Sequence, residues 1–72
     1  MANRPFDMLN EAIGKEILVE LKGNVVIRGT LRSFDVHLNL VFENAEQLEN
    51  GEPKRKYGKL MVRGDNVILI NP

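Results

Sequence analysis

Short runs of alternating apolar and polar residues, interrupted by turn-forming residues, make up most of the chain. Residues 16–21 read EILVEL, which places Ile17, Val19 and Leu21 on one face. Alternation with a period of two is typical of a half-buried β-strand, because successive side chains point to opposite faces. The KGN at 22–24 suits a tight turn, since glycine and asparagine tolerate positive φ. The pattern therefore predicts antiparallel strands joined by hairpins.

Two glycines inside the predicted strands indicate a strongly bent sheet. Residues 25–34 read VVIRGTLRSF, with Gly29 in the interior. Glycine weakens a strand unless the strand bends sharply or another backbone comes close. Gly58, within KYGKLMVR at 56–63, is a second candidate for a bend or a bulge. A strongly bent sheet of short strands predicts a small barrel.

The most regular alternation lies in SFDVHLNLVF at 33–42, where Val36, Leu38 and Leu40 alternate with Asp35, His37 and Asn39. We expect a third strand here that continues through NAEQLE at 44–49. His37 and Asn39 would then project side by side from the polar face, roughly 6 to 7 Å apart by the rise per strand residue. The stretch alone leaves open whether that face only contacts water or binds a ligand.

The remaining β-like segments predict a hairpin and a last strand. Residues 49–53, within LENGEPKRK, read as a hairpin loop whose charges form a solvated tip, with contact to RNA or to a partner as the alternative. RGDN at 63–66 reads as a turn, and VILI at 67–70 reads as a fully buried strand. Together with the preceding runs, these segments give five strands.

A short helix is expected before the strands, at about residues 4–13. Pro5 suits the first helical position, and Gly14 is placed to end the helix. Apolar residues recur at spacings of three and four, which predicts a stripe packed on the core: Phe6, Leu9 and Ile13. We therefore expect a single domain over residues 1–72, with one helix followed by five strands.

So small a chain needs a further source of stability. Burial at this size barely offsets the entropy lost on ordering the chain. The 72 residues include no cysteine and one histidine, so a disulfide is excluded and a structural metal is not expected. No cofactor or small-molecule substrate is expected either. Oligomerisation is the remaining common device, because neighbouring copies can cover apolar surface and sheet edges.

Charge and hydropathy limit the possible partners and location. Ten Lys and Arg balance ten Asp and Glu, which argues against binding nucleic acid through bulk positive charge but leaves room for a focused basic site. No run of about 18 apolar residues is present. The start, MANRPFDMLN, lacks the apolar core of a signal peptide. We expect a cytoplasmic protein that does not insert into membranes.

Two stretches in a fixed order, GTLRSFDVHLNLV at 29–41 and MVRGDNVILI at 61–70, resemble the motifs of the Sm-like (LSm) proteins, most closely the archaeal ones. The first Sm motif, within about residues 16–48, is carried by Gly29, Leu31, Phe34, Asp35, Asn39 and Leu40. The second, within about residues 54–71, is carried by Arg63, Gly64 and Asn66. Either piece alone would be weak, whereas both together are quite specific.

The resemblance implies a mostly β fold, in which a short helix caps a strongly bent five-stranded antiparallel barrel of the SH3 or OB type. It also implies a hexameric or heptameric ring of identical subunits, with the heptamer favoured, in which the fourth strand of one copy pairs with the fifth of the next. Such a ring would bind single-stranded, uridine-rich RNA at its inner rim and serve RNA processing or metabolism.

The RNA pocket that the resemblance implies consists of His37, Asn39, Arg63, Gly64 and Asp65. The flat imidazole of His37 and the flat guanidinium of Arg63 can sandwich an unstacked base. The amide of Asn39 offers a donor and an acceptor, which match the edge of uracil. Gly64 would let the backbone turn and approach the nucleotide closely, with a requirement of the hairpin alone as the alternative.

Further roles are expected at the edges of this pocket. Asp35 or Asp65 can hold Arg63 in its plane through a charge-assisted hydrogen bond, although Asp35 can equally serve to cap a turn. Arg4 and Phe34 are candidates for a second RNA surface near the helix, offering a charge and an aromatic face. Phe34 has a core position as its alternative.

Two other classes of function compete with RNA binding. Catalysis needs a nucleophile beside a base, spaced carboxylates or metal ligands, and the sequence identifies no such convergent set, so no enzyme is expected. A small barrel used for protein interaction or assembly, without a physiological RNA ligand, stays open because fold does not fix function.

Overall fold

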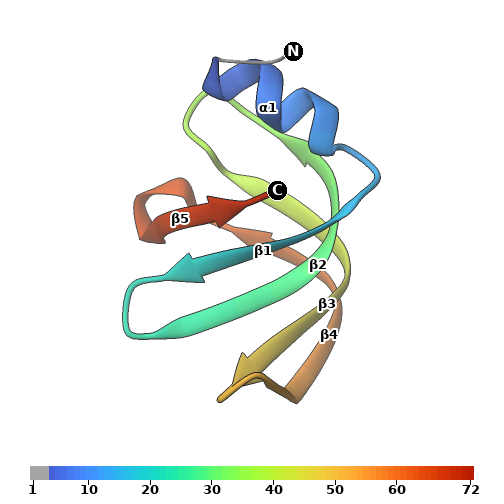
Figure 1. The fold of residues 1–72 in the computed structure, drawn as a ribbon, viewed down its shortest axis with the longest axis vertical. Helices are drawn as coiled ribbons and strands as arrows, with labels where there is room; N and C mark the ends of the chain where they lie inside the picture. Colours follow the sequence, from blue (N-terminus) through green and yellow to red (C-terminus); the bar gives the residue numbers. More distant parts are fainter. Residues whose placement is uncertain (1–3) are drawn as a thin grey trace.

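The computed structural model describes residues 4–72 (Figure 1). The elements in chain order are α1 (Pro5–Ala12), β1 (Glu16–Leu21), β2 (Val25–Phe34), β3 (Leu40–Glu49), β4 (Glu52–Val62), the 3₁₀ helix η1 (Gly64–Asn66) and β5 (Val67–Asn71). All strand pairs are antiparallel, in the order β4-β3-β2-β1-β5, so β4 and β5 form the two edges of one bent sheet. The predicted fold class is confirmed. Within the described part of the chain, no helix has the length and apolarity needed to cross a membrane.

The bent sheet encloses one apolar core, and α1 lies across one end of it (Figure 1). The buried core residues come from α1 and from four strands: Leu9, Ala12, Ile17, Val19, Ile27, Leu31, Leu40, Phe42, Ala45 and Val62. Because β2 and β3 each supply several of these side chains, the segment that joins β2 to β3 is anchored at both ends by the core.

The predicted apolar stripe of the helix is only partly correct. Leu9 is buried as expected, but the second buried helical side chain is Ala12 rather than Ile13. Ile13 has an extended backbone (ψ 130°) just after the helix, so its side chain leaves the stripe and is exposed. Phe6, in the first turn, is also exposed, although its ring packs edge-to-face on the ring of Phe34.

Both glycines expected to bend the sheet lie at register irregularities next to Ala45. The register between β2 and β3 shifts between Arg28 and Thr30, that is, at Gly29. A Cβ added at Gly29 would lie 3.1 Å from the Cα of Ala45, which is closer than ordinary van der Waals contact. The close approach of β3 to β2 at this point therefore favours glycine. Gly58 pairs with Ala45 from the other side and has φ +75°. The sheet therefore bends where the sequence predicted.

The prediction of a strand through SFDVHLNLVF is wrong. β2 ends at Phe34 and β3 begins at Leu40, and the five residues between them form a turn, here called loop 35–39. Leu38 has φ +61° and Val36 is 75% exposed, so neither belongs to an apolar strand face. The physical reason is that the carboxylate of Asp35 accepts backbone N–H groups of the loop, which gives the backbone an alternative to strand pairing.

The prediction that VILI at 67–70 is fully buried is also wrong for the single chain. Ile68 is 55% exposed and Leu69 is 46% exposed. The reason is that β5 pairs with β1 on one side only and has an open edge on the other.

We predict that Gly29→Val destabilises the fold by about 1–3 kcal/mol, because the added side chain must displace the backbone of Ala45. Urea denaturation measures the change. Ser33→Ala, at an exposed position of the same strand, is the control and should alter stability by less than about 0.5 kcal/mol. Equal stability of Gly29→Val and the native chain would contradict the close approach of β2 and β3.

Candidate nucleic-acid interface

Loop 35–39 is organised by the side chain of Asp35. Its Oδ1 accepts hydrogen bonds from the backbone N–H groups of His37 (2.9 Å) and Asn39 (3.1 Å). Its Oδ2 accepts a third bond from the side-chain Nδ2 of Asn39 (3.0 Å). Asp35 therefore caps the turn, the alternative role considered from the sequence, and at the same time fixes the side chain of Asn39.

These bonds favour the charged form of Asp35. The Asn39 side-chain N–H is the largest cause that lowers the pKa of this carboxyl below its ordinary value of 3.8, followed by the backbone N–H of Asn39. A depressed carboxyl pKa stabilises the loop fully above the ordinary value, and this contribution is lost as the pH falls through the lowered pKa. At neutral pH the loop is therefore fully supported.

A hydrogen bond joins loop 35–39 to the turn that contains η1. The backbone N–H of Gly64 donates to Oδ1 of Asn39 over 2.9 Å, across 25 positions of the sequence. A Cβ added at Gly64 would overlap the carbonyl oxygen of His37. Since Gly64 is not among the residues with positive φ, glycine is required here by the contact between the two loops. This role differs from the expected one, a close approach to a nucleotide.

The two loops together line an open hollow of about 500 Å³, here called the loop hollow: His37, Asn39, Arg63, Gly64 and Asp65. All five residues that the sequence placed in the pocket thus lie together. The guanidinium of Arg63 lies 3.7 Å from the carboxylate of Asp65, and the two side chains are 74% and 66% exposed. Asp65, rather than Asp35, is therefore the acidic neighbour of Arg63.

Asn39 retains hydrogen-bonding capacity after joining the loops. A side-chain amide has two N–H donors and two acceptor lone pairs. Asn39 uses one donor toward Asp35 and one acceptor toward Gly64. One N–H and one lone pair are left. The two existing bonds also fix the orientation of the amide, because its Nδ2 faces Asp35 and its Oδ1 faces Gly64. The sequence did not reveal this locking, because both partners are set by the folded backbone.

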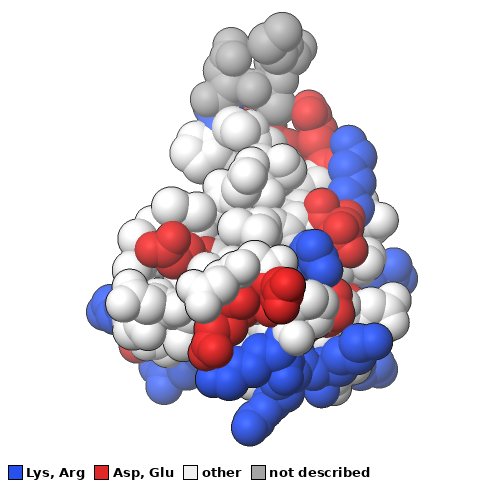
Figure 2. All heavy atoms as spheres, turned by 60° about the horizontal axis from the view of Figure 1, so that its bottom comes forward, with Lys and Arg blue, Asp and Glu red and all other residues white. Residues whose placement is uncertain are grey.

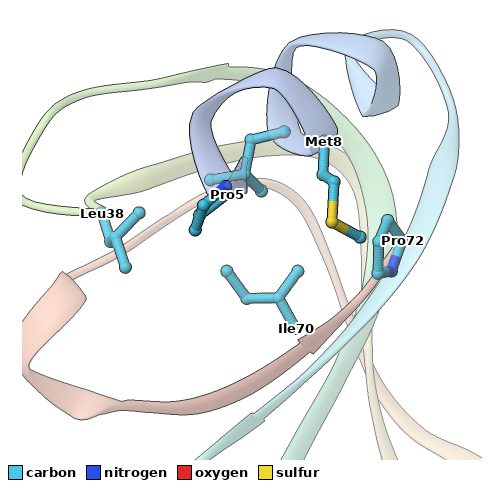
Figure 3. A pocket seen from close by; sticks show the side chains of 6 residues that line it. Pro5, Met8, Leu38, Ile70 and Pro72 are labelled. Carbon is cyan, nitrogen blue, oxygen red and sulfur yellow. The ribbon is translucent and has the colours of Figure 1, made fainter. Parts of the chain in front are cut away.

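Loop 35–39 is anchored on the core side by Leu38, which packs against the apolar core. Leu38 also lines an apolar hollow of about 160 Å³ formed with Pro5, Met8, Leu9, Ile70 and Pro72 (Figure 3). The loop therefore has an apolar attachment on one side and presents polar groups at the loop hollow. This arrangement replaces the two-faced strand expected from the alternation.

The second candidate surface, Arg4 with Phe34, is less clearly assembled. The ring of Phe34 packs edge-to-face on Phe6, with centroids 5.1 Å apart. The Nε of Arg4 lies 3.2 Å from Oδ2 of Asp7. Phe34 thus lies beside the first turn of α1, but residues 4–72 show no recorded contact between Phe34 and Arg4. Within residues 4–72, no three His, Asp or Glu side chains lie close enough together to hold a metal ion.

Comparisons with known proteins agree with the geometry. The family model of the LSM domain matches residues 7–72. A putative snRNP Sm-like protein of Thermococcus sibiricus is 50% identical over 72 residues, which cover 100% of this chain and 95% of the relative. The structure of the Pyrococcus abyssii Sm protein in complex with a uridine heptamer is similar with a TM-score of 0.93 and 43% identity, over 97% of this chain and 99% of that one. A heptameric archaeal Sm protein is similar with a TM-score of 0.86 and 47% identity, over 92% and 96% of the two chains. The family resemblance inferred from the two motifs is confirmed.

Gly64→Ala should separate the two loops, because the new methyl group overlaps the carbonyl oxygen of His37. We expect a loss of about 1–3 kcal/mol in the free energy of unfolding, measured by denaturant titration, and a changed NMR shift of the residue 64 amide. Asp65→Ala, at the exposed neighbouring position, should stay within about 0.5 kcal/mol of the native value. A fully stable Gly64→Ala protein would refute the contact between the loops.

An NMR titration of the Asp35 carboxyl should give a pKa below 3.8. Asn39→Ala removes the largest cause of this shift and should raise the pKa toward the ordinary value. The backbone amide shifts of His37 and Asn39 should follow the same titration, since both N–H groups donate to Asp35. A carboxyl that titrates at or above 3.8 in the native protein would contradict the turn geometry.

Proposed function

The chain belongs to the LSM domain family, and on that premise we propose that it forms a ring of identical subunits and binds single-stranded, uridine-rich RNA at the inner rim. The observation that carries the proposal is the hydrogen bond from Gly64 to Asn39, which joins the two motif loops into one site. The similar Pyrococcus abyssii structure, in complex with a uridine heptamer, supports the choice of ligand. A cytoplasmic role in RNA processing or metabolism, by binding rather than catalysis, completes the proposal.

The loop hollow has the groups needed to hold one base. The exposed imidazole of His37 and guanidinium of Arg63 provide flat surfaces for stacking, which is tolerant of base identity. The free N–H and lone pair of Asn39 provide the selective contact. Uracil presents a carbonyl acceptor beside a ring N–H, as thymine does, whereas cytosine presents an amino donor at the same place. The site therefore favours uracil over cytosine.

The two sheet edges provide the surfaces for ring closure. In the proposed ring, β4 of one subunit pairs with β5 of the next, which satisfies the open backbone groups of β5 and of a matching stretch of the longer β4. The same contact can cover Met61 on β4 and Ile68 and Leu69 on β5, which are 67%, 55% and 46% exposed in the single chain. The similar archaeal Sm protein is a heptamer, which supports a ring of that size.

Repetition of the loop hollow explains how a weak site becomes useful. Stacking contributes about 1–3 kcal/mol per base, so one hollow alone would bind only in the millimolar range or more weakly. Copies that engage successive nucleotides add affinity through effective concentration. Repetition of Arg63 also makes a locally positive rim in a chain whose formal net charge is zero.

Arg63→Ala should weaken heptauridine binding at least about tenfold without unfolding the protein, because stacking of one base is worth about 1–3 kcal/mol. Arg63 is 74% exposed and its one recorded ion pair is 3.7 Å long, so the fold does not depend on it. Fluorescence anisotropy with labelled heptauridine and heptacytidine measures both affinity and preference. Arg32→Ala, which removes an exposed arginine of β2 that pairs with Glu43, is the matched control and should bind as the native chain does.

Asn39→Ala should lose both affinity and the preference for uridine over cytidine. Equal binding of the two oligomers by the native protein would remove the assigned role of Asn39. An assembly module without an RNA ligand predicts instead that native protein, Arg63→Ala and Asn39→Ala all ignore both oligomers.

A further inference from the structure

The β3–β4 hairpin carries a concentrated positive charge that the loop hollow does not use. Four basic residues lie within six positions of β4, and all are exposed: Lys54, Arg55, Lys56 and Lys59, here called the hairpin surface. Figure 2 shows Lys and Arg side chains gathered in a band along the lower edge of the face that is turned toward the viewer. In a chain with no formal net charge, such a concentration marks a place where an anion is favoured.

Most of this charge is not neutralised within the subunit. Lys54 pairs with Glu49 over 2.9 Å, with both side chains more than half exposed, and such a surface pair contributes little free energy. For residues 4–72, the recorded ion pairs include none for Arg55, Lys56 or Lys59. Glu46, which lies opposite Lys56, already pairs with Arg28 over 3.1 Å. In the single chain the hairpin surface is therefore available to an external ligand. In the proposed ring, the five residues of β5 can pair with less than half of the eleven residues of β4, which leaves the hairpin end of β4 uncovered.

The position of the hairpin fits a ligand that continues past the loop hollow. The tip of the β3–β4 hairpin lies at the end of the molecule opposite α1 (Figure 1). In a closed ring every subunit would present its hairpin on the same side, so the basic residues would repeat around one mouth of the ring. A strand that leaves the inner rim on that side runs toward these residues.

We propose that the hairpin surface binds the phosphodiester backbone of RNA that extends beyond the uridine held in the loop hollow. This inference rests on the proposed function and adds a second, sequence-independent contact to it. Lys and Arg neutralise phosphates without reading bases, whereas base edges are read elsewhere. A protein partner fits less well, because Tyr57 is the one large exposed aromatic or apolar side chain between Glu52 and Lys59, and its hydroxyl already donates to Gln47. An interface with so little apolar anchor lacks a hot spot.

The test compares heptauridine with heptauridine that carries an oligocytidine tail of about 16 nucleotides, the upper end of the length bound by one small barrel. The tail is placed at the 5′ or the 3′ end in separate probes. The native protein should bind one tailed probe at least about tenfold more tightly than heptauridine at low salt. The double variant Arg55→Gln, Lys56→Gln should bind heptauridine as the native chain does and lose this advantage. Its slope of log affinity against log salt should fall by about 0.7 for each phosphate contact removed.

The matched control is Lys15→Gln, Arg32→Gln, which removes one lysine and one arginine from two exposed positions outside the hairpin and should keep the advantage. The inference is overturned if neither tail strengthens native binding, if Arg55→Gln, Lys56→Gln keeps the advantage, or if that variant also loses heptauridine binding. Competition by polyglutamate as strong as that by oligocytidine would overturn it in favour of an acidic protein partner. Native protein that ignores heptauridine but binds the tail through Arg55 and Lys56 would overturn the proposed function and uphold the hairpin contact.

Discussion

The hydrogen bond between Gly64 and Asn39 is the interaction on which the candidate site depends. It connects two loops that lie 25 positions apart and makes them one surface. Its acceptor is held in place by Asp35, whose carboxylate binds the side chain of Asn39 and two backbone N–H groups of loop 35–39. Its donor can approach because residue 64 has no Cβ to meet the carbonyl of His37. Without the bonds from Asp35, or with a Cβ at residue 64, His37 and Arg63 would no longer line a common hollow.

The bent sheet serves this junction by bringing the ends of β2, β3 and β4 to one place. β2 and β3 supply fully buried side chains, including Leu31, Leu40 and Phe42, so the ends of loop 35–39 are fixed by packing. Val62, also buried, precedes Arg63 and fixes the start of the second loop. The polar groups of the site are thus mounted on short loops whose ends are rigid, which limits the entropy lost when a ligand binds.

Local patterns in the sequence were sufficient for most of the fold. Alternation in EILVEL, the KGN turn and the strand glycines Gly29 and Gly58 depend on neighbouring residues, so they predicted strands, turns and bends correctly. The error at loop 35–39 shows where such patterns fail. Apolar and polar residues alternate there by type, but the conformation is decided by hydrogen bonds from Asp35 to the backbone, which hydropathy does not register.

The sequence predicted which residues lie together in the candidate site, but it did not predict the contacts that they make with one another. The two motifs placed His37, Asn39 and Arg63 together, and the structure does so too. That Asn39 and Gly64 bond to each other could not be read from the chain, because the contact exists only after the sheet has folded. The exposure of Ile68 and Leu69 has a similar cause, since the partner proposed to cover β5 is another copy of the chain.

In the proposed assembly, a site too weak to act alone is repeated around a closed ring. Native mass spectrometry of the protein with and without heptauridine tests it most directly, because one spectrum reports the subunit number and the bound RNA. We expect a closed assembly, most simply the heptamer seen for the similar archaeal Sm protein, which gains the mass of one heptauridine. A monomer that gains no RNA under the same conditions would rule out such an assembly.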